Sequence, residues 1–517
     1  MTLAWIGQED FAVGILRSSA RGSEPGVGVI GALNGLFDDD GDVYRRGGDF
    51  YASNVADGPI TFVWSGYLND QPRTLVATAT KTYSYAAGVL TEIDPTGVAR
   101  PCLPAIVGER LWLPIGKSWD GGVALAGFTP AEHVAAIADR LVVANGNRIA
   151  FSVAGDPTNF VIDDFHELPD GVQVRGMVSV RDTLLAFTNY GLWAVTNMAF
   201  DLTDEAGNPQ QTLQRLAPEL SLLHESGLSE WEGKIVAPCT DRILLVDPAA
   251  PVIALSESIS PLYLDFVRRG DKPGGAKVFR NHLFLPMLNP AGTAVTGTLV
   301  CRLNRPVQGR VLYFPWSTFD GHAGSNLVFD VSLLGAAPKL IGGNADGRLC
   351  DLTDIFNPSD LNASDALGTH AFELQTRDYQ TGRGEPSHTK RLRLYYTLRG
   401  AGTIKAAYST GLATQTYESL LETSADYAAM LATYPSYETV FRGGDTSAVT
   451  TDDDPDRWWQ GLVDQAFESA GVDPVNWNLP RADRTRFVRA WLRCEDAVER
   501  LVIHRLEFGV RPATHRR

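Results

Sequence analysis

The stretches LVVANGNRIAF, residues 141–151, and LLAFTNYGLWAV, residues 184–195, each hold two short apolar runs around a tight turn. Their Asn-Gly and Asn-Tyr-Gly turns supply the positive φ angles that short hairpin loops need. The apolar runs are too short for helices, so each stretch predicts a β-hairpin. Four more stretches share this pattern: LVATATKTYSY (75–85), KIVAPCTDRILLV (234–246), HLFLPMLNPAGTAVTGTLVCRL (282–303) and LIGGNADGRLCDL (340–352).

The turns of these six hairpins follow one another with a mean step of about 53 residues. A hairpin that recurs at this interval is typical of a β-propeller, in which two further strands complete each blade. One small sheet cannot bury both of its faces, whereas sheets stacked radially bury all of them. The sequence therefore predicts an all-β fold built on a β-propeller of six or seven blades. A β-sandwich with fortuitous spacing is the alternative.

The propeller is predicted over residues 59–370, and the segments on either side differ from it. Residues 1–58 include a polar, Gly-rich stretch and LNGLFDDDGDVYRRGGDFYAS, which predict an N-terminal arm with short hairpins. Residues 371–517 predict a small β-sandwich-like C-terminal domain, because apolar and polar residues alternate along two long stretches at 389–411 and 484–510.

A helical insertion is expected inside the C-terminal domain, at about residues 415–483. YESLLETSADYAAMLATY and DRWWQGLVDQAFESAG space their apolar residues as an amphipathic helix does. Asp454 before Pro455 offers an N-cap followed by proline at the first helical position.

Composition narrows the class of protein. Of 517 residues, 45 are Lys or Arg and 61 are Asp or Glu, giving a net charge of −16, which argues against a surface that neutralises nucleic-acid phosphates. The five cysteines are far apart and odd in number, as expected of buried free thiols in a reducing compartment. We expect no membrane-spanning segment and no secretion signal, and therefore synthesis in a cytoplasm.

Short motifs typical of cofactor or metal sites lack the flanking elements or the spacing that such sites require. Gly26, Gly28 and Gly31 match a dinucleotide fingerprint without the strand and helix that must flank it, and Gly116-Lys117-Ser118 lacks the first glycine of a phosphate-binding loop. The Asp-rich runs at 38–42 and 452–456 lack calcium-loop spacing, and no histidines pair as metal ligands. We predict no catalytic, cofactor or metal residues, although sequence leaves open a site assembled across blades.

Four residues are candidates for contacts with partner chains. Arg45 and Arg46 form the basic turn of the N-terminal arm. Trp458 and Trp459 stand side by side at a predicted helix start, where adjacent side chains point about 100° apart. We therefore expect one of the two indoles to be exposed or at an interface, with local packing as the alternative.

Residues 30–410 resemble the β-propeller tail proteins of short-tailed phages, known as tail nozzle, tail hub or packaged-DNA stabilisation proteins. The resemblance rests on three stretches, NGLFDDDGDVYRRGGDFYAS (34–53), DRLVVANGNRIAFSVAGDPTNFV (139–161) and RDTLLAFTNYGLWAVTN (181–197). The Gly-Asp-Pro-Thr-Asn-Phe run at 155–160 is the most specific part. A later stretch from residue 374 to 411 resembles the β domain that often follows the propeller, and the expected insertion has no counterpart there.

The resemblance implies a structural virion protein that forms a ring, usually a hexamer, below the portal and adaptor rings. Such a ring contacts the portal or adaptor and the distal tail proteins, extends the DNA channel, retains packaged DNA and permits ejection. Its acidic charge would let DNA slide past without specific binding. The expected location is the virion tail or neck, after synthesis in the host bacterial cytoplasm. The alternatives are a receptor- or glycan-binding propeller at the tail tip, a polysaccharide-cleaving propeller enzyme and a cellular scaffold.

Overall fold

The computed structural model divides the chain into two compact units. Unit 1 comprises residues 1–48 and 354–517, and unit 2 comprises residues 49–353. The structure describes residues 4–8, 14–15, 28–37, 43–46, 50–122, 125–196, 212–308, 312–320, 324–335, 337–356, 371–376, 379–380, 387–399, 402–409, 414–421, 474–478, 487–494 and 500–512.

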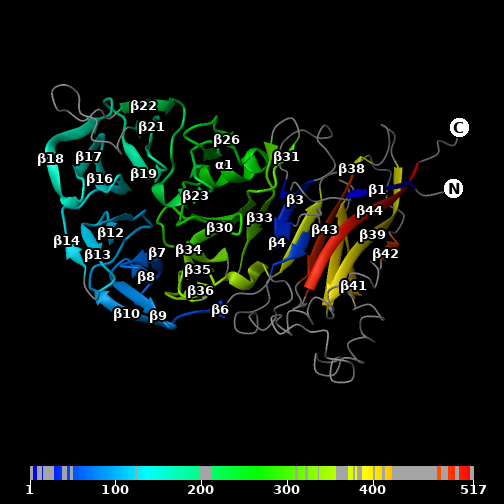
Figure 1. Ribbon diagram of the computed structural model, residues 1–517. Coiled ribbons are helices and arrows are strands. Elements are labelled where there is room, and N and C mark those ends of the chain that lie inside the picture. The colour runs from blue at the N-terminus through cyan, green and yellow to red at the C-terminus, as the bar shows by residue number, and fades with distance from the viewer. Residues whose placement is uncertain are drawn as a thin grey trace, which may run out of the picture. The chain divides into compact units, whose positions relative to one another are not determined.

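Unit 2 is a β-propeller, which confirms the predicted fold class (Figure 1). Six of its antiparallel four-stranded meanders are separate sheets. Three of them contain β7 (Ile60–Leu68), β8 (Gln71–Thr78), β9 (Thr82–Ala86) and β10 (Val89–Asp94); β11 (Ala105–Val107), β12 (Arg110–Leu113), β13 (Lys117–Trp119) and β14 (Ala126–Gly127); and β15 (His133–Ile137), β16 (Arg140–Asn145), β17 (Arg148–Val153) and β18 (Asp156–Glu167).

The next two separate sheets contain β19 (Val174–Val180), β20 (Thr183–Thr188), β21 (Gly191–Thr196) and β22 (Thr212–Ala217); and β23 (Ser229–Trp231), β24 (Lys234–Pro238), β25 (Ile243–Val246) and β26 (Ile253–Ala254). A further meander repeats the order with β27 (Lys272–Pro273) and β28 (Lys277–Phe279) on β29 (His282–Leu288), then β30 (Val295–Arg302) and β33 (Trp316–Phe319). A short hairpin, β31 (Val307–Gln308) and β32 (Leu312–Tyr313), precedes β33.

The sixth separate sheet closes the propeller with a strand from the other end of the unit. It contains β34 (Asn326–Ser332), β35 (Lys339–Asn344), β36 (Leu349–Asp351) and β6 (Phe50–Tyr51). Tyr51 pairs with Cys350, and the Ala52 N–H donates to the Leu349 carbonyl at 2.7 Å. The Arg348 guanidinium lies 4.5 Å from the centroid of the Tyr51 ring. The first and last strands of the propeller are thus joined by hydrogen bonds.

All six predicted hairpins form the two middle strands of a blade, and the structure adds a seventh hairpin of this kind. This hairpin is β12–β13, whose strands are only four and three residues long. Its turn contains Gly116 at φ 80° but no Asn-Gly or Asp-Gly pair. In addition, β13 reads Lys-Ser-Trp, so the second apolar run that marks a hairpin is missing here.

Apolar side chains between neighbouring blades hold the propeller together. Phe62 and Trp64 of β7 pack with Leu111 and Trp119 of the next blade, and the two indoles meet edge to face at 6.5 Å. Fully burying a large apolar side chain contributes about 1.5–3 kcal/mol. These interblade clusters therefore supply the burial that a single sheet lacks.

Helices are few in the part of the chain that the structure describes. They are α1 (Ser260–Arg268) and the 3-10 turns η1 (Glu225–Gly227), η2 (Glu257–Ile259) and η3 (Thr353–Phe356). Pro261 stands in the first turn of α1, where a proline needs no amide donor. The helix buries Tyr263 and Phe266, and the Tyr263 hydroxyl donates to the Cys239 carbonyl at 2.6 Å.

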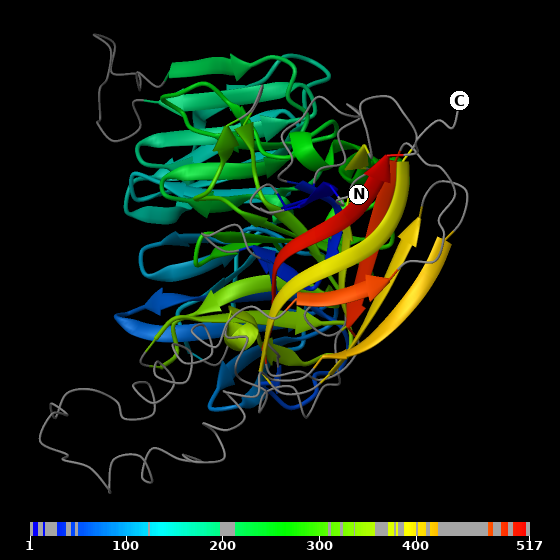
Figure 2. The same cartoon turned by 90° about the vertical axis from the view of Figure 1, so that its right-hand side faces the viewer.

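Unit 1 contains two antiparallel sheets, as the sandwich prediction requires. One holds β4 (Gly35–Phe37), β5 (Val43–Arg45), β44 (Arg500–Pro512), β39 (Ser387–Arg399) and β42 (Pro474–Asn478), with β1 (Ala4–Gln8) also on β44. The other holds β3 (Gly28–Leu33), β37 (Phe372–Thr376), β43 (Phe487–Cys494), β40 (Gly402–Ser409) and β41 (Thr414–Leu421), with β2 (Gly14–Ile15) on β3 and β38 (Tyr379–Gln380) on β43. Figure 2 shows β39 in yellow beside β44 in red.

The two sheets bury apolar side chains between them. A Cβ at Gly35 in the first sheet would lie 3.3 Å from the Phe372 ring of the second. Leu374 and Leu492 are buried on one sheet, and Ile503 and Phe508 are buried on the other. Glycine at position 35 therefore permits the close approach of the two layers.

The unit boundaries differ from the predicted domains in two ways. Residues 1–48 do not form a separate arm, because β1 and β5 pair with β44 at the far end of the chain. The predicted helical insertion is corrected at both ends, where β41 and β42 are strands. β41 continues the β40 hairpin, with Ser409 opposite Thr414, which local apolar spacing does not reveal. Residues 422–473 lie outside the described residues.

Candidate functional site

Three chain segments line the interior of the propeller: residues 100–104, 224–230 and 272–277. Their first residues surround a small pocket, and their later residues line a larger cavity. The same three segments thus contribute to both spaces, which together are the candidate functional site.

The larger cavity has a volume of 190 Å³ and lies among the inner strands β7, β19, β23, β28 and β34. The Lys277 ammonium lies 2.6 Å from an Asp330 carboxylate oxygen. The other oxygen of Asp330 accepts the Ser65 backbone N–H at 2.7 Å. The main charges on this wall are thus paired and bridge neighbouring blades.

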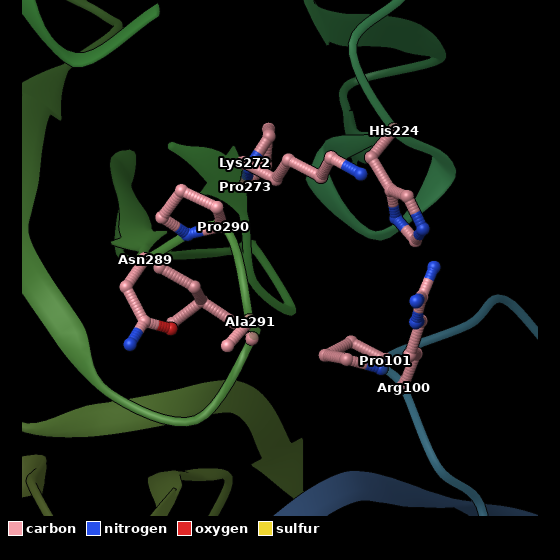
Figure 3. Close-up of a pocket in the computed structure, with 10 residues that line it drawn as sticks. Arg100, Pro101, His224, Lys272, Pro273, Asn289, Pro290 and Ala291 are labelled. Carbon is pink, nitrogen blue, oxygen red and sulfur yellow. The ribbon is translucent and has the colours of Figure 1, made fainter. Parts of the chain in front are cut away.

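The smaller pocket gathers basic side chains from three separate places in the sequence. Figure 3 shows Arg100 and Lys272 directed toward His224 from different elements. Arg100 belongs to the connection between β10 and β11, Lys272 to β27, and His224 is the N-cap of η1. Pro101 and Pro273 follow the two cations directly and restrict the backbone next to them.

His224 stays neutral in this setting. Burial, together with the nearby charges of His133, Lys272, Arg100 and Arg175, lowers the pKa of His224 to about 4. The Ser226 backbone N–H donates to Nδ1 of His224 at 3.3 Å. The Ser226 hydroxyl oxygen lies 2.8 Å from the same nitrogen. Both contacts with Ser226 hold the neutral ring in place.

A buried ion pair lies next to the pocket. Nδ1 of His133 is 2.6 Å from a Glu225 carboxylate oxygen, and Nε2 of His133 is 3.2 Å from the Val174 carbonyl. With acceptors at both nitrogens, the ring makes both bonds only as the imidazolium. Although burial opposes it, contact with the Glu225 carboxylate raises the pKa of His133. The Glu225 carboxylate is therefore paired with His133.

The positive charges of Arg100, Arg175 and Lys272 are not neutralised. Within the described residues, the side chains of Arg100, Arg175 and Lys272 make no hydrogen bond and no ion pair. All three are exposed to solvent. Sequence analysis missed this site because its members come from distant connections. The sequence contains one indication of the site: Arg100, Arg175 and Lys272 each lie close to the start of an inner strand.

The predicted interface residues do not belong to this site. Arg45 and Arg46 are buried, at 8% and 4% exposure. Nε of Arg46 donates to the Asn34 side-chain oxygen at 3.0 Å, and the Asn34 amide donates to the Ala371 carbonyl at 2.7 Å. This basic turn therefore ties segments of unit 1 together. Trp458 and Trp459 lie outside the described residues.

Other features noted in the sequence have ordinary structural places. Gly116-Lys117-Ser118 falls in the β12–β13 turn and not at the start of a helix. The five cysteines are free; four are buried and Cys102 lines the cavity. The described residues contain no group of three potential metal-ligating side chains. None of their helices has the length and apolar character needed to cross a membrane.

Comparisons with known proteins yield only distant structural similarities. No family model and no curated protein matches the chain. The WD40 domain of Pan2 from Neurospora crassa is 11% identical with a TM-score of 0.36, over 61% of this chain and 97% of that one. BamB from Moraxella catarrhalis is 12% identical with a TM-score of 0.31, over 62% and 95%.

An extracellular domain of a two-component system from B. thetaiotaomicron is 9% identical with a TM-score of 0.38. The match covers 69% of this chain but only 45% of that protein. At these scores the similarities carry no functional argument. The assignment of the propeller rests on the strand pairing itself.

Proposed function

We propose that this chain is a structural virion protein that forms an oligomeric ring at the tail or neck of a phage. The ring would extend the DNA channel below the portal, retain the packaged DNA and open a path for ejection. The proposal rests on how the two ends of the propeller are attached to the rest of the chain. Both ends of the propeller continue directly into unit 1, at residues 48–49 and 353–354.

Attachment of both propeller ends suits a protein that must resist mechanical load. The closing strand β6 is hydrogen-bonded to β36, so the first and last strands of unit 2 hold each other. Beyond these strands, β5 and β37 are both anchored in the sheets of unit 1. Pulling the propeller open requires breaking both attachments, which fits the wall of a pressurised channel.

The stretches on which the resemblance to phage tail proteins rests lie at defined places in the fold. Residues 34–53 contain the β4–β5 hairpin of unit 1 and the closing strand β6 of unit 2. Residues 155–160 form the turn into β18, where Gly155 has φ 75° and the Asp156 carboxylate accepts the Thr158 hydroxyl at 2.9 Å. The resembling residues therefore coincide with closure and turn positions of the propeller.

The first test is assembly of the purified full chain, followed by native mass spectrometry and negative-stain electron microscopy. We expect closed rings of a single stoichiometry. A strictly monomeric chain at all concentrations, with and without the adjacent tail proteins, would contradict self-assembly into a ring.

The second test locates the chain in particles by immunogold labelling. Gold at the head–tail junction or along the tail stub supports the ring. Gold confined to the tail tip would replace it with the receptor- or glycan-binding alternative. Unlabelled particles would overturn the virion role and favour the enzyme or cellular-scaffold alternatives.

A further inference from the structure

We propose that the pocket between Arg100, His224 and Lys272 binds a phosphate-type oxyanion with two negative charges. The ligand is a free phosphate or a phosphate group at the end of a larger molecule. This assignment is independent of ring formation. It rests on the charge, the donor groups and the size of the pocket.

The charge of the pocket calls for an anion of more than one charge. Arg100 and Lys272 line the pocket with two positive charges, and Arg175 is close enough to act on His224. Among the described residues no side chain forms an ion pair with any of the three. The nearby carboxylates are occupied elsewhere. Glu225 is held by His133 at 2.6 Å, and Asp271 is held by Arg269 at 3.0 Å.

Two further acidic or polar neighbours do not compensate these charges. Glu132 is exposed and accepts the Gly146 backbone N–H at 2.9 Å. Asn289 on the pocket wall is engaged with Thr293, whose backbone N–H donates to the Asn289 oxygen at 2.9 Å. The positive charge of the pocket therefore faces solvent.

The donor groups match the geometry of an oxyanion. A guanidinium offers two parallel N–H donors to two oxygens, and an ammonium adds a compact charge. The neutral imidazole of His224 lines the pocket beside the two cations and adds no further charge. Figure 3 shows Arg100 and Lys272 directed toward His224 from separate elements. Convergence of three elements distinguishes the pocket from a row of surface lysines.

The size of the pocket selects a small group. Its volume of 30 Å³ holds about two water-sized groups. That space admits part of one tetrahedral oxyanion, with its remaining oxygens toward solvent, and excludes a sugar ring or a base. A terminal phosphate can therefore enter the pocket while the rest of its molecule stays outside.

The test is isothermal titration calorimetry of the full chain with inorganic phosphate at constant ionic strength. We expect saturable binding at one site per chain. Arg100→Gln and Lys272→Gln should each weaken binding about tenfold or more, because each removes a charge-assisted contact. Arg110→Gln is the matched control: it removes one exposed arginine charge from the β11 blade, where Arg110 is paired with Asp120.

Lys272→Arg should retain most of the affinity because it restores the charge. Circular dichroism and thermal melting in chloride confirm that each variant is folded. The proposal is overturned if wild type shows no saturable binding, or if Arg100→Gln and Lys272→Gln bind phosphate as tightly as Arg110→Gln does. Competition by a DNA duplex lacking terminal phosphates would overturn the assignment to a doubly charged phosphate, because backbone phosphodiesters carry one charge each. Failure of this competition supports a free or terminal phosphate.

Discussion

The two units of this protein are both built mainly from antiparallel strands, but unit 1 also pairs strands from opposite ends of the sequence. In the propeller, Asn145 lies opposite Arg148 across a two-residue turn. In unit 1, Ala4 lies opposite Val510. Within the propeller, only the closing strand β6 resembles unit 1 in this respect, because Tyr51 pairs with Cys350.

This difference shows which part of a fold local sequence can encode. A two-residue loop closes at small entropic cost and leaves a sequence signal in its turn residues. A strand that must find a partner hundreds of residues away has no turn to mark it. Its pairing is determined by the packing of the completed sheet.

The largest expected loss of stability follows from replacing a buried phenylalanine in either unit, by Phe508→Ala in unit 1 or Phe151→Ala in unit 2. Both rings are fully buried, Phe508 between β1 and β39 and Phe151 within its blade. Each substitution should lower the free energy of unfolding by about 3–5 kcal/mol. Limited proteolysis should map the new cleavage sites of Phe508→Ala to unit 1 and those of Phe151→Ala to unit 2. Identical cleavage maps would mean that the two units unfold as one.

Glu225→Ala tests a non-local contact inside the propeller. At pH 6 the loss of the carboxylate leaves the His133 charge buried without its partner, which should cost about 3 kcal/mol. The pKa of His133 is raised in the folded protein, so its contribution is complete below pH 6.5 and is lost as the pH rises through the raised value.

The difference between wild type and Glu225→Ala, measured by urea denaturation, should therefore be larger at pH 6 than at pH 9. Glu225→Gln keeps a hydrogen-bond acceptor and should lose less stability. An equal difference at both pH values would show that the interaction is not ionic.

Acid should weaken the propeller through histidines that are buried in neutral form. Burial lowers the pKa of His282 to about 4. The unfolded chain then binds more protons, so stability falls as the pH drops from 6.5 toward 4. Between pH 7 and pH 5, wild type should lose about 2 kcal/mol more than His282→Gln. Urea midpoints at both pH values measure this, and parallel losses would contradict it.

The smallest effect is expected at a turn. Gly155 has φ 75°, and a Cβ there would have 3.6 Å to the Asp139 carboxylate, so strain arises from the backbone alone. Gly155→Ala should cost about 1–2 kcal/mol. Gly58→Ala is the control, because its Cβ has open space and its φ is not in the positive range. Thermal melts that shift equally for both variants would show that the turn tolerates a side chain.

The sequence was sufficient to predict the propeller but not its functional site. Six hairpins are indicated by paired apolar runs around a turn, and β12–β13 is not, because its second strand, Lys-Ser-Trp, offers no apolar run. The basic pocket escaped notice because Arg100, Arg175 and Lys272 are far apart in an acidic chain. Arg45 and Arg46 are predicted at an interface; within the chain both are buried, and the contact of Arg46 with Asn34 is one that no local pattern encodes.

The position of the closing strand has a consequence for synthesis on the ribosome. β6 emerges about 300 residues before its partner β36, and β1 emerges about 500 residues before β44. At roughly 5–20 residues per second, β6 waits about 15–60 s and β1 about 25–100 s for a partner. During this time the blades between them can form in order. The N-terminal strands must remain soluble without their partners, so slow translation or a delay near the C-terminus prolongs the period in which they are open to aggregation.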